Sequence, residues 1–458
     1  MLVFISDLHY RDDPFFTIPA SATEGFLGQN LIPMIEDAGA KEVTVVFLGD
    51  LVDINRSKYW VDGSSRTSSN YWYRPWSNWK EALAKIPGAS QGSDPNFNTQ
   101  EFERHILNIL AAIRKENHRN YALWRNFKRK EEDLWKGFSG NKSDIEIKLE
   151  FIPGNHDRLA QYSPAIRAAL RDDLDLDQNP AEPFPWVKED EAYAVTAFHG
   201  HVLTATDFGS EEVPQSLTSS PWYDVPGLGD AATVYFGIGI VQEFAAQAST
   251  EEEKALARSL GEIDLIRPQA FLLRWLARWG LQNTSVKPKV DQIVVKAFKD
   301  MLNEEFVRWR EDIGWLKQLL LKILNFKTVE DVMHFVEKQD TGPKTAEEYI
   351  QSMVKAITQP RMTDWLNNHR IIPRNIVSGH THGPIIIPIK GKLGARPEEE
   401  TIYFNTGTWL PVIEAGAGIG FTRRNKIVHI TFYKEGEESK SDGKRSYWEF
   451  WEGNLREG

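Results

Sequence analysis

Residues 43–53, VTVVFLGDLVD, combine the two features that decide the fold class. The first six residues form an apolar run rich in Val and Phe, which is typical of a buried β-strand. The run stops at Gly49, and two aspartates follow, Asp50 and Asp53. In α/β proteins, polar residues at the carboxyl end of a buried strand commonly build the binding site. The stretch therefore predicts a strand that delivers carboxylates to a site.

The same pattern occurs at four other places in the chain. The apolar runs, with the polar residues that follow them, are 2–6 (LVFIS) with Asp7 and His9, 147–152 (IKLEFI) with GNHD at 154–157, 193–198 (YAVTAF) with His199 and His201, and 374–377 (RNIV) with SGHTH at 378–382. Six of the 11 histidines lie in the five clusters. Each cluster alone has an ordinary explanation as a turn or a strand end. Together, five strand ends of like chemistry predict one shared site.

The composition excludes several kinds of site and partner. The chain has 458 residues and a formal net charge of −11, which argues against a protein whose main task is to bind a nucleic acid backbone. It has no cysteine, so disulfides, thiolate metal sites and cysteine nucleophiles are excluded. The first residues, MLVFISDLHY, have no basic region, and no apolar run approaches the roughly 18 residues of a membrane span. We expect a cytoplasmic protein without integral membrane association.

The clusters also indicate how the chain is divided. Core strands resume after two segments that do not share the strand–cluster pattern. We therefore expect one core domain from residues 1–53, 147–240 and 371–458. The segment 54–146, an aromatic loop followed by a helical pattern, and the helical segment 241–370 are predicted to be insertions into this core.

Periodicity gives the expected structure of the second insertion and of the C-terminal part. Apolar residues at helical spacing in the insertion are Leu272, Trp275, Leu276 and Trp279. Residues 254–327 hold 14 Lys and Arg against 8 Asp and Glu, and they include Trp275, Trp279, Trp309 and Trp315. This segment is either a basic cap over the site or a set of amphipathic helices packed on the core, and we favour the second. Strand-like alternation at 402–406, 409–414, 426–433 and 446–451 predicts a second sheet packed against the first.

The side chains of the five clusters suit metal ions. Carboxylate, imidazole and amide ligands bind Mn, Fe, Zn, Co or Ni, and here they are numerous enough for two ions. Two ions about 3.5–4 Å apart bind phosphoryl oxygens and lower the pKa of a water molecule between them. Glycines beside the ligands permit tight turns and close approach of the backbone.

In chain order, the motifs D-x-H, G-D-x-x-D, G-N-H-D, H and G-H-x-H resemble those of the calcineurin-like metallophosphoesterase superfamily, between residues 7 and 382. The resemblance implies an α/β fold, a four-layer α/β/β/α sandwich of two mixed β-sheets flanked by helices, with large, mainly helical insertions. It implies a phosphoester hydrolase, a phosphatase or phosphodiesterase, that uses two divalent metal ions, with Mn²⁺ as the ion for assays in vitro. A hydroxide bridging the ions would attack phosphorus in line.

The resemblance also implies a role for each matched residue. The implied metal ligands are Asp7, His9 and His382 for the first ion, Asn155, His199 and His380 for the second, and Asp50 for both. His156 would be the general acid that protonates the leaving oxygen, positioned by Asp157. Asp53 would orient a ligand, with an ordinary turn aspartate as the alternative.

The residues beside these motifs have open roles. Arg56 and Arg158 would each bind a substrate phosphate or form a surface salt bridge. His201 would contact the substrate, support the fold or act as a ligand. Asn405 and Trp409, in FNTGTW, are expected to support the site structurally.

Several substrates remain possible at this stage. A phosphodiesterase or pyrophosphohydrolase and a phosphomonoesterase are the leading alternatives, with a small-molecule or nucleotide-like phosphoester favoured over duplex nucleic acid. A nuclease of the same superfamily and a non-catalytic metal-binding interaction scaffold are the other two. The sequence does not indicate the oligomeric state.

Overall fold

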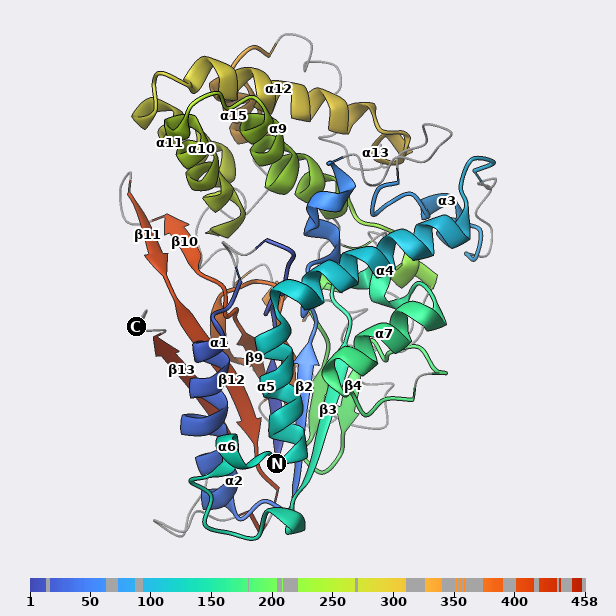
Figure 1. The fold of residues 1–458 in the computed structure, drawn as a ribbon, viewed down its shortest axis with the longest axis vertical. Coiled ribbons are helices and arrows are strands. Elements are labelled where there is room, and N and C mark those ends of the chain that lie inside the picture. The colour runs from blue at the N-terminus through green and yellow to red at the C-terminus, as the bar shows by residue number, and fades with distance from the viewer. Residues whose placement is uncertain are drawn as a thin grey trace.

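The computed structural model describes residues 1–13, 17–62, 73–86, 94–179, 181–203, 208, 221–267, 271–309, 326–339, 351, 354–355, 358, 374–389, 401–415, 420–434, 436–437 and 447–454. All predicted site residues are among them, whereas Trp315 lies outside the described residues. The chain is an α/β protein with two five-stranded mixed sheets, as predicted for the class (Figure 1).

The first sheet has the strand order β13-β12-β1-β2-β3. Its strands are β1 (Leu2–Ile5), β2 (Glu42–Leu48), β3 (Glu146–Ile152), β12 (Lys426–Phe432) and β13 (Trp448–Asn454). β1, β2 and β3 are parallel, while β12 runs antiparallel to both β1 and β13. The carboxyl ends of the three parallel strands therefore meet at one edge of the sheet, where the first three polar clusters begin.

The second sheet has the order β4-β5-β7-β9-β8. Its strands are β4 (Lys188–Asp190), β5 (Val195–Ala197), β7 (Asn375–Ser378), β8 (Pro384–Ile389) and β9 (Thr401–Thr406). β5, β7 and β9 are parallel. Phe4 and Val46 of the first sheet share one apolar cluster with Val377 and Phe404 of the second, so the two sheets face each other.

The C-terminal strands are distributed differently from the prediction. β9 lies in the second sheet, but β12 and β13 extend the first sheet beside β1. β10 (Val412–Ala415) pairs with β11 (Phe421–Arg424) and β6 (Ile266–Arg267) in a third, three-stranded sheet. The prediction that all four segments form one second sheet was wrong, because alternation identifies a strand but leaves its partner to tertiary packing.

Helices cover the outer face of the first sheet. The helices in this part of the chain are α1 (Ala20–Gly25), α2 (Ile32–Ala38), α3 (Trp79–Leu83), α4 (Thr99–Glu116), α5 (His118–Arg129), α6 (Glu132–Trp135) and α7 (Pro164–Leu174). Trp124 of α5 packs edge-on against Phe47 of β2, with ring centroids 4.9 Å apart. The segment 54–146 thus contributes helices to the core layer itself.

A group of helices forms the end of the molecule toward which β2 points (Figure 1). We call it the helical group. Its members are α8 (Leu228–Ala232), α9 (Ile240–Ala246), α10 (Glu251–Leu260), α11 (Leu272–Gln282), α12 (Lys287–Asn303), α13 (Glu305–Trp309) and α15 (Val329–Gln339), together with the helical segments Thr233–Gly239 and Gly261–Leu265 that connect them. Trp275 and Trp279 are buried in it, as the helical spacing predicts. The predicted insertion begins at residue 241, but the helices of this group begin earlier, with α8 at Leu228. The short strand β6 lies between α10 and α11.

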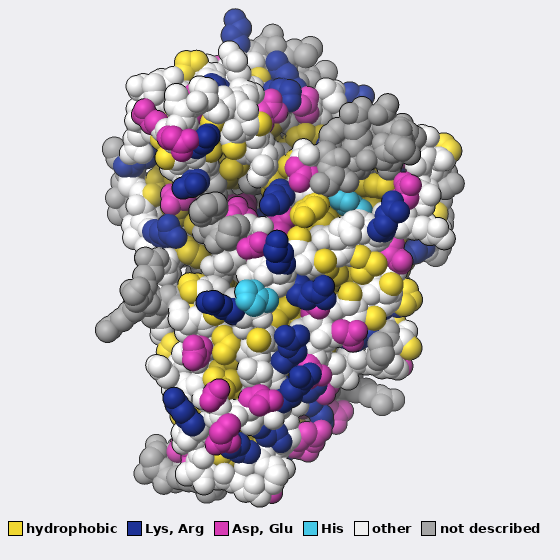
Figure 2. Space-filling model, viewed as in Figure 1, with side chains coloured by type: hydrophobic (Ala, Val, Ile, Leu, Met, Phe, Trp, Pro, Cys, Tyr) yellow, Lys and Arg dark blue, Asp and Glu magenta, His cyan; other side chains and the backbone are white. Residues whose placement is uncertain are grey.

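The surface carries charges of both signs. On the face seen in Figure 2, Lys and Arg side chains are interspersed with Asp and Glu over both the core and the helical group. Of the helices in the described ranges, none combines the length and the apolar character that crossing a bilayer requires.

Candidate metal centre

The seven predicted metal ligands come together where the parallel strands of both sheets end. Among the described residues, three groups of possible ligand atoms form, each with all its atoms within 4.8 Å of one another. The first group contains Asp7, His9 and His382, and the second contains Asp50, His199 and His380. The third shares His9 with the first and adds Asp53 and His156, neither of which is a predicted ligand. The seventh predicted ligand, Asn155, joins the second group, because its Oδ1 atom lies 3.1 Å from His380 Nδ1.

The first group has the spacing of ligands around one ion. The Nε2 atoms of His9 and His382 lie 3.0 Å apart, and Asp7 Oδ1 lies 3.3 Å from His382 Nε2 and 3.7 Å from His9 Nε2. Metal–nitrogen distances of about 2.0–2.1 Å place two ligand nitrogens roughly 3.3 Å apart in a tetrahedral site. The donor atoms therefore fit a common cation.

The second group shows the same convergence around Asp50. His199 donates a hydrogen bond from Nδ1 to the carbonyl oxygen of Leu48, at 2.9 Å. Its Nε2 atom then faces Asp50 Oδ2 at 3.1 Å. When the imidazole is neutral, its Nε2 atom is an acceptor, and so is the carboxylate oxygen of Asp50. A cation or a proton must therefore lie between them. Asp50 Oδ2 is also 3.9 Å from His9 Nε2, which places this carboxylate between the two groups, as expected of a bridging ligand.

The electrostatics of the site favour positive charge. Burial lowers the pKa of His199, but the carboxylate of Asp50 outweighs this effect and raises the pKa to about 10. Burial raises the pKa of Asp7, but hydrogen bonds from His382 and His9 hold it well below its usual range. Without an ion, protons on His9 and His199 balance the buried carboxylates, whereas burial and the positive charge of Arg267 hold the pKa of His382 well below its usual value. A divalent cation would take over the same role.

The backbone at the ligands is in the left-handed region. Among the described residues, eight that are not glycine have positive φ, and five of these are predicted ligands. They are Asp7 (φ 53°), His9 (49°), Asp50 (51°), His380 (75°) and His382 (60°). Such conformations are costly for L-residues and are typical of functional sites, where the surrounding structure enforces them.

Two glycines make room for the carboxylates, as the sequence suggested. A Cβ atom on Gly154 would overlap with the Asp50 side chain, and one on Gly379 would overlap with the side chains of Ser6 and Asp7. Hydrogen bonds from the FNTGTW stretch support the same loops. Asn405 donates from Nδ2 to the carbonyl oxygen of Gly379 at 2.6 Å.

Asp53 orients one predicted ligand, His9, directly. Its Oδ1 atom accepts a hydrogen bond from His9 Nδ1 at 2.7 Å, so that His9 Nε2 faces the first group. Such a bond fixes the tautomer and the ring direction of a ligating histidine. Asp53 is fully buried and has the position predicted for a residue that orients a ligand.

His156 lies beside the ligands, but its predicted pairing with Asp157 was wrong. The Asp157 carboxylate accepts hydrogen bonds from the backbone amides of Gly154 (2.5 Å) and Leu51 (2.7 Å), and so ties two loops together. It is Asp53 that faces the His156 ring, with Oδ1 3.2 Å from Nδ1. Burial raises the pKa of Asp157 to about 7, with Asp50 contributing to the rise. In His156, burial and the positive charge of Arg56 lower the pKa. Among the described residues, no hydrogen bond joins the Asp157 carboxylate to the His156 ring, and the motif alone does not reveal this.

The two arginines with open roles, Arg56 and Arg158, have different surroundings in the structure. Arg158 donates to the carbonyl oxygens of Asp224 (2.8 Å) and Pro75 (2.9 Å), so it holds loops together and does not face the site. It also forms an ion pair with Asp230 at 3.5 Å, but this pair is buried and not on the surface. Arg56, in contrast, lines the cavity at the metal centre.

His201 lies behind the second group of ligands. Its ring centroid is 5.5 Å from that of His199, and it contacts the rings of Trp186 and Tyr223 at 6.1 and 6.3 Å. The residue is buried in this aromatic surrounding. These surroundings favour a role in supporting the fold, one of the three roles considered for His201.

A small cavity separates the metal centre from the helical group. Its volume is about 70 Å³. The lining residues are Asp50, Arg56, Asn155, His156, His380 and His382 on one side, and Gly229, Ala232, Thr233, Phe236, Gly237, Ile263, Asp264, Arg267 and Leu272 on the other. The helical group therefore forms one wall of the site, and of the described residues on this wall Arg267 is the one that is basic.

Sequence reasoning missed three charged residues at this cavity or just behind it. Arg267 Nη2 lies 3.4 Å from His382 Nε2, and Asp264 and Arg11 form a buried ion pair at 3.2 Å. None of these three residues lies in one of the five motifs from which the site was predicted. The buried residues Ile263, Leu265 and Ile266 beside Asp264 and Arg267 indicate burial without indicating a site, whereas Arg11 stands two residues after His9.

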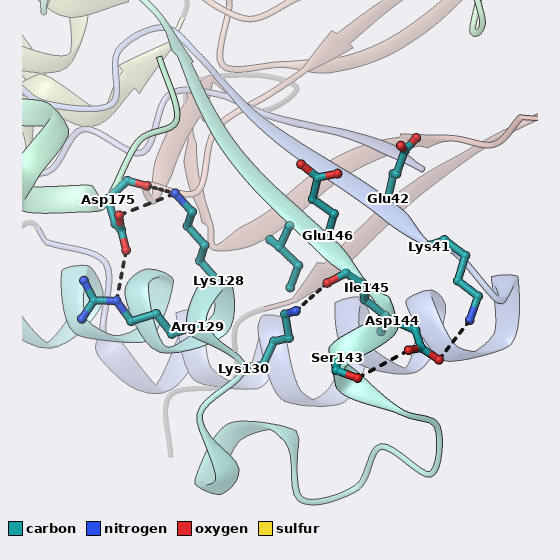
Figure 3. A pocket seen from close by; sticks show the side chains of 11 residues that line it. Lys41, Glu42, Lys128, Arg129, Lys130, Ser143, Asp144, Ile145, Glu146 and Asp175 are labelled. Carbon is teal, nitrogen blue, oxygen red and sulfur yellow. Dashed lines mark hydrogen bonds and ion pairs between the residues drawn. The ribbon is translucent and has the colours of Figure 1, made fainter. Parts of the chain in front are cut away.

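A second, larger hollow lies where β2 and β3 begin, at the opposite end of these strands from the ligands (Figure 3). Its volume is about 630 Å³. The charged side chains that line it pair with one another: Asp175 contacts Lys128 (3.5 Å) and Arg129 (3.0 Å), and Asp144 contacts Lys41 (3.9 Å). We assign no ligand to this hollow.

Comparisons with known proteins do not identify a family. The chain matches no protein-family model and no curated protein.

Proposed function

We propose that the protein is a phosphoester hydrolase of the calcineurin-like metallophosphoesterase superfamily that uses two divalent metal ions. The observation that carries this proposal is the pair of ligand groups that share Asp50, with Oδ2 3.1 Å from His199 Nε2 and 3.9 Å from His9 Nε2. Two ions bound in this way would supply Lewis acid chemistry, by binding phosphoryl oxygens and lowering the pKa of water.

The proposal includes the four-layer α/β/β/α sandwich. Support for three layers comes from the helices on the outer face of the first sheet and from the apolar cluster between the sheets. The outer face of the second sheet packs its own apolar cluster, which includes Phe198, Ile376 and Tyr403. A helical layer over that cluster completes the proposed sandwich.

His156 is the proposed proton donor to the leaving oxygen. Its Nδ1 atom faces Asp53, its Nε2 atom lies 4.0 Å from Asp50 Oδ2, and the residue lines the cavity. The ring is thus oriented by one carboxylate and borders the space that a substrate would enter. General acid catalysis of this kind contributes roughly 10²–10⁴-fold to rate.

The shape of the site supports a small phosphoester as substrate. The cavity is narrow, and the helical group closes one side of it with apolar residues such as Phe236 and Leu272. Arg267 supplies positive charge on the cavity wall, whereas the charge of Arg56 on the same wall is balanced by Asp53 and Asp264. A guanidinium group binds phosphate oxygens through its planar fork. A duplex nucleic acid would require a wide basic surface, whereas charges of both signs are interspersed on the face in Figure 2.

The experiment that tests the proposal uses the full chain stripped of metal and reloaded with Mn²⁺. We expect two ions per chain and hydrolysis of p-nitrophenyl phosphate or bis-p-nitrophenyl phosphate, with the ratio of the two rates reporting mono- against diesterase preference. An Asp50→Asn control should lose most of both metal binding and turnover. Two bound ions with no turnover of any phosphoester in a mono-, di- and pyrophosphate panel would instead support a metal-binding scaffold.

A further inference from the structure

A closed ring of four charged side chains joins the helical group to the metal centre. Asp264, in the helical turn Gly261–Leu265 of the helical group, lies 3.2 Å from Arg11 Nη1 and 3.4 Å from Arg56 Nε. On the opposite side, Asp53 Oδ2 lies 2.8 Å from Arg11 Nη2 and 3.6 Å from Arg56 Nη1. Each arginine therefore bridges the same two carboxylates. We call these four residues the charge ring.

The charge ring is buried and electrically balanced. The exposed fractions of its side chains are 0% for Asp53, 2% for Arg56, 5% for Arg11 and 10% for Asp264. A buried ion costs several kcal/mol unless a partner of opposite charge compensates it. Burial lowers the pKa of Arg56, but the carboxylates of Asp264 and Asp53 outweigh this and raise it, so the guanidinium stays charged. Loss of one carboxylate would leave one buried positive charge uncompensated.

Asp53 connects the charge ring to the ligands. One of its oxygens, Oδ2, faces the two arginines, while the other, Oδ1, accepts the hydrogen bond from His9 Nδ1 at 2.7 Å. The direction of this carboxylate is therefore set jointly by His9 and by the arginines. The arginines are in turn held from the far side by Asp264. Packing fixes the place of Asp264, because a Cβ atom on Gly237 would lie 2.7 Å from its Oδ1 atom.

We propose that Asp264 is a positioning residue through which the helical group directs His9 toward the first metal ion. With Asp264 neutral, both guanidinium groups would draw on Asp53 alone and turn its carboxylate from His9 Nδ1. The ion held by Asp7, His9 and His382 would then bind more weakly, and the second ion would be affected less. This inference rests on the metal centre of the proposed function, but it does not depend on the reaction.

The test measures Co²⁺ binding to the full chain after metal removal. Co²⁺ is added stepwise, and both the visible absorption bands and the heat of binding are followed. We expect Asp264→Asn to weaken one of the two binding events roughly tenfold, the lower end of the range for residues that support metal ligands. A His382→Ala variant identifies which event belongs to the first group. Asp264→Glu, which keeps the charge, should restore most of the affinity.

The matched control is Glu262→Gln, in the same helical turn. Glu262 pairs with Arg423 at 3.1 Å on the surface, with exposed fractions of 33% and 44%, and has no contact with the charge ring. It should leave both binding events and the absorption bands unchanged. If Asp264→Asn does not fold, Arg11→Lys answers the same question, because a single ammonium group cannot bridge two carboxylates as a guanidinium fork does.

The outcomes separate this inference from the proposed function. Unchanged binding of both ions in the Asp264→Asn or the Arg11→Lys variant would overturn the inference, as would equal weakening of both events. Either result would leave hydrolysis by the wild-type protein intact. Conversely, a wild-type chain that binds two Co²⁺ ions without hydrolysing any phosphoester would overturn the proposed function, and selective weakening would still support the role of Asp264.

Discussion

The Nε2 atoms of His9 and His382 lie 3.0 Å apart, although 373 positions separate the two residues along the chain. His9 follows the first strand of the first sheet, and His382 follows β7 of the second sheet. The facing of the two sheets brings these strand ends together. Two imidazole nitrogens at this distance require a proton or a cation between them. The sheet packing therefore positions ligands from both ends of the chain.

The two histidines of the GHTH turn should serve different ions. His382 belongs to the first group of ligands and His380 to the second. We expect His382→Ala to weaken the first site, and His380→Ala the second, each by at least roughly 100-fold, more than is lost when a supporting residue is changed. Metal content after gel filtration at limiting Mn²⁺ should fall from two ions to one in each variant. Loss of both ions from both variants would contradict the separate assignment.

Metal removal should destabilise the protein. Several buried carboxylates lie together at the centre, and their repulsion is relieved by bound cations. At a free Mn²⁺ concentration 100 times the dissociation constant, each site should add about 2.7 kcal/mol to the free energy of unfolding. Thermal unfolding in Mn²⁺ and in chelator measures the difference. The Asp50→Asn variant serves as control, because it should show little difference between the two conditions.

The convergence of the predicted ligands could be predicted from the sequence because each one follows a buried strand. A strand end fixes the position of the next few residues within the fold, so Asp7, Asp50 and His199 are placed by local structure once the sheets form. Residue type then indicates the chemistry. The same reasoning could not place Asp264, whose position depends on how a long helical segment folds back over the site.

The motifs also do not predict which side chains contact one another. In GNHD, the aspartate next to His156 was expected to position it, yet Asp53, about a hundred positions away, faces the ring. Asp157 binds backbone amides instead, because the turn brings the amide of Gly154 within reach of its carboxylate. Sheet pairing has the same limit: the alternation of β12 does not show that it pairs with β1.

His156→Ala should separate catalysis from metal binding. His156 lies outside the two groups that contain the predicted ligands, and its Nδ1 atom faces Asp53, so we expect the metal content to stay near that of the wild type. Turnover of esters with poor leaving groups, such as alkyl phosphates, should fall by roughly 10²–10⁴-fold. Esters of p-nitrophenol should lose much less, because their leaving group needs no proton. Equal loss for both classes of ester, or loss of the metals, would assign His156 another role.

Asp157→Asn should have a different signature from His156→Ala. Above its pKa of about 7, the Asp157 carboxylate is charged and accepts amide hydrogen bonds from Leu51 and Gly154 in a fully buried site, where bonds to a charged group are worth about 1.5–3 kcal/mol each. We expect a loss of stability of that order in urea unfolding. The relative rates on good and poor leaving groups should be unchanged, and a selective loss on poor leaving groups would restore the proton-transfer role predicted from the motif.

His429 should make the fold sensitive to acid. It is fully buried in β12, where its ring lies 5.5 Å from that of Trp451 and 5.0 Å from that of Phe26. Neither ring nitrogen has a hydrogen-bond partner among the described residues. Burial lowers the pKa of His429 to about 3, whereas an unfolded histidine has a pKa of about 6.5. Between these values the unfolded chain binds the proton and the folded chain does not.

Stability contributed by neutral His429 is therefore complete above pH 6.5 and is lost as the pH falls toward 3, by about 1.4 kcal/mol per pH unit. A His429→Phe variant keeps a ring of similar size and lacks the titrating group. From pH 7 to pH 5, we expect its free energy of unfolding to fall about 2 kcal/mol less than that of the wild type. Urea unfolding at pH 7, 6 and 5 measures this difference, with replacement of the exposed His118 by Gln as the control that should follow the wild type. Parallel curves for wild type and His429→Phe would show that the buried ring takes up its proton without unfolding.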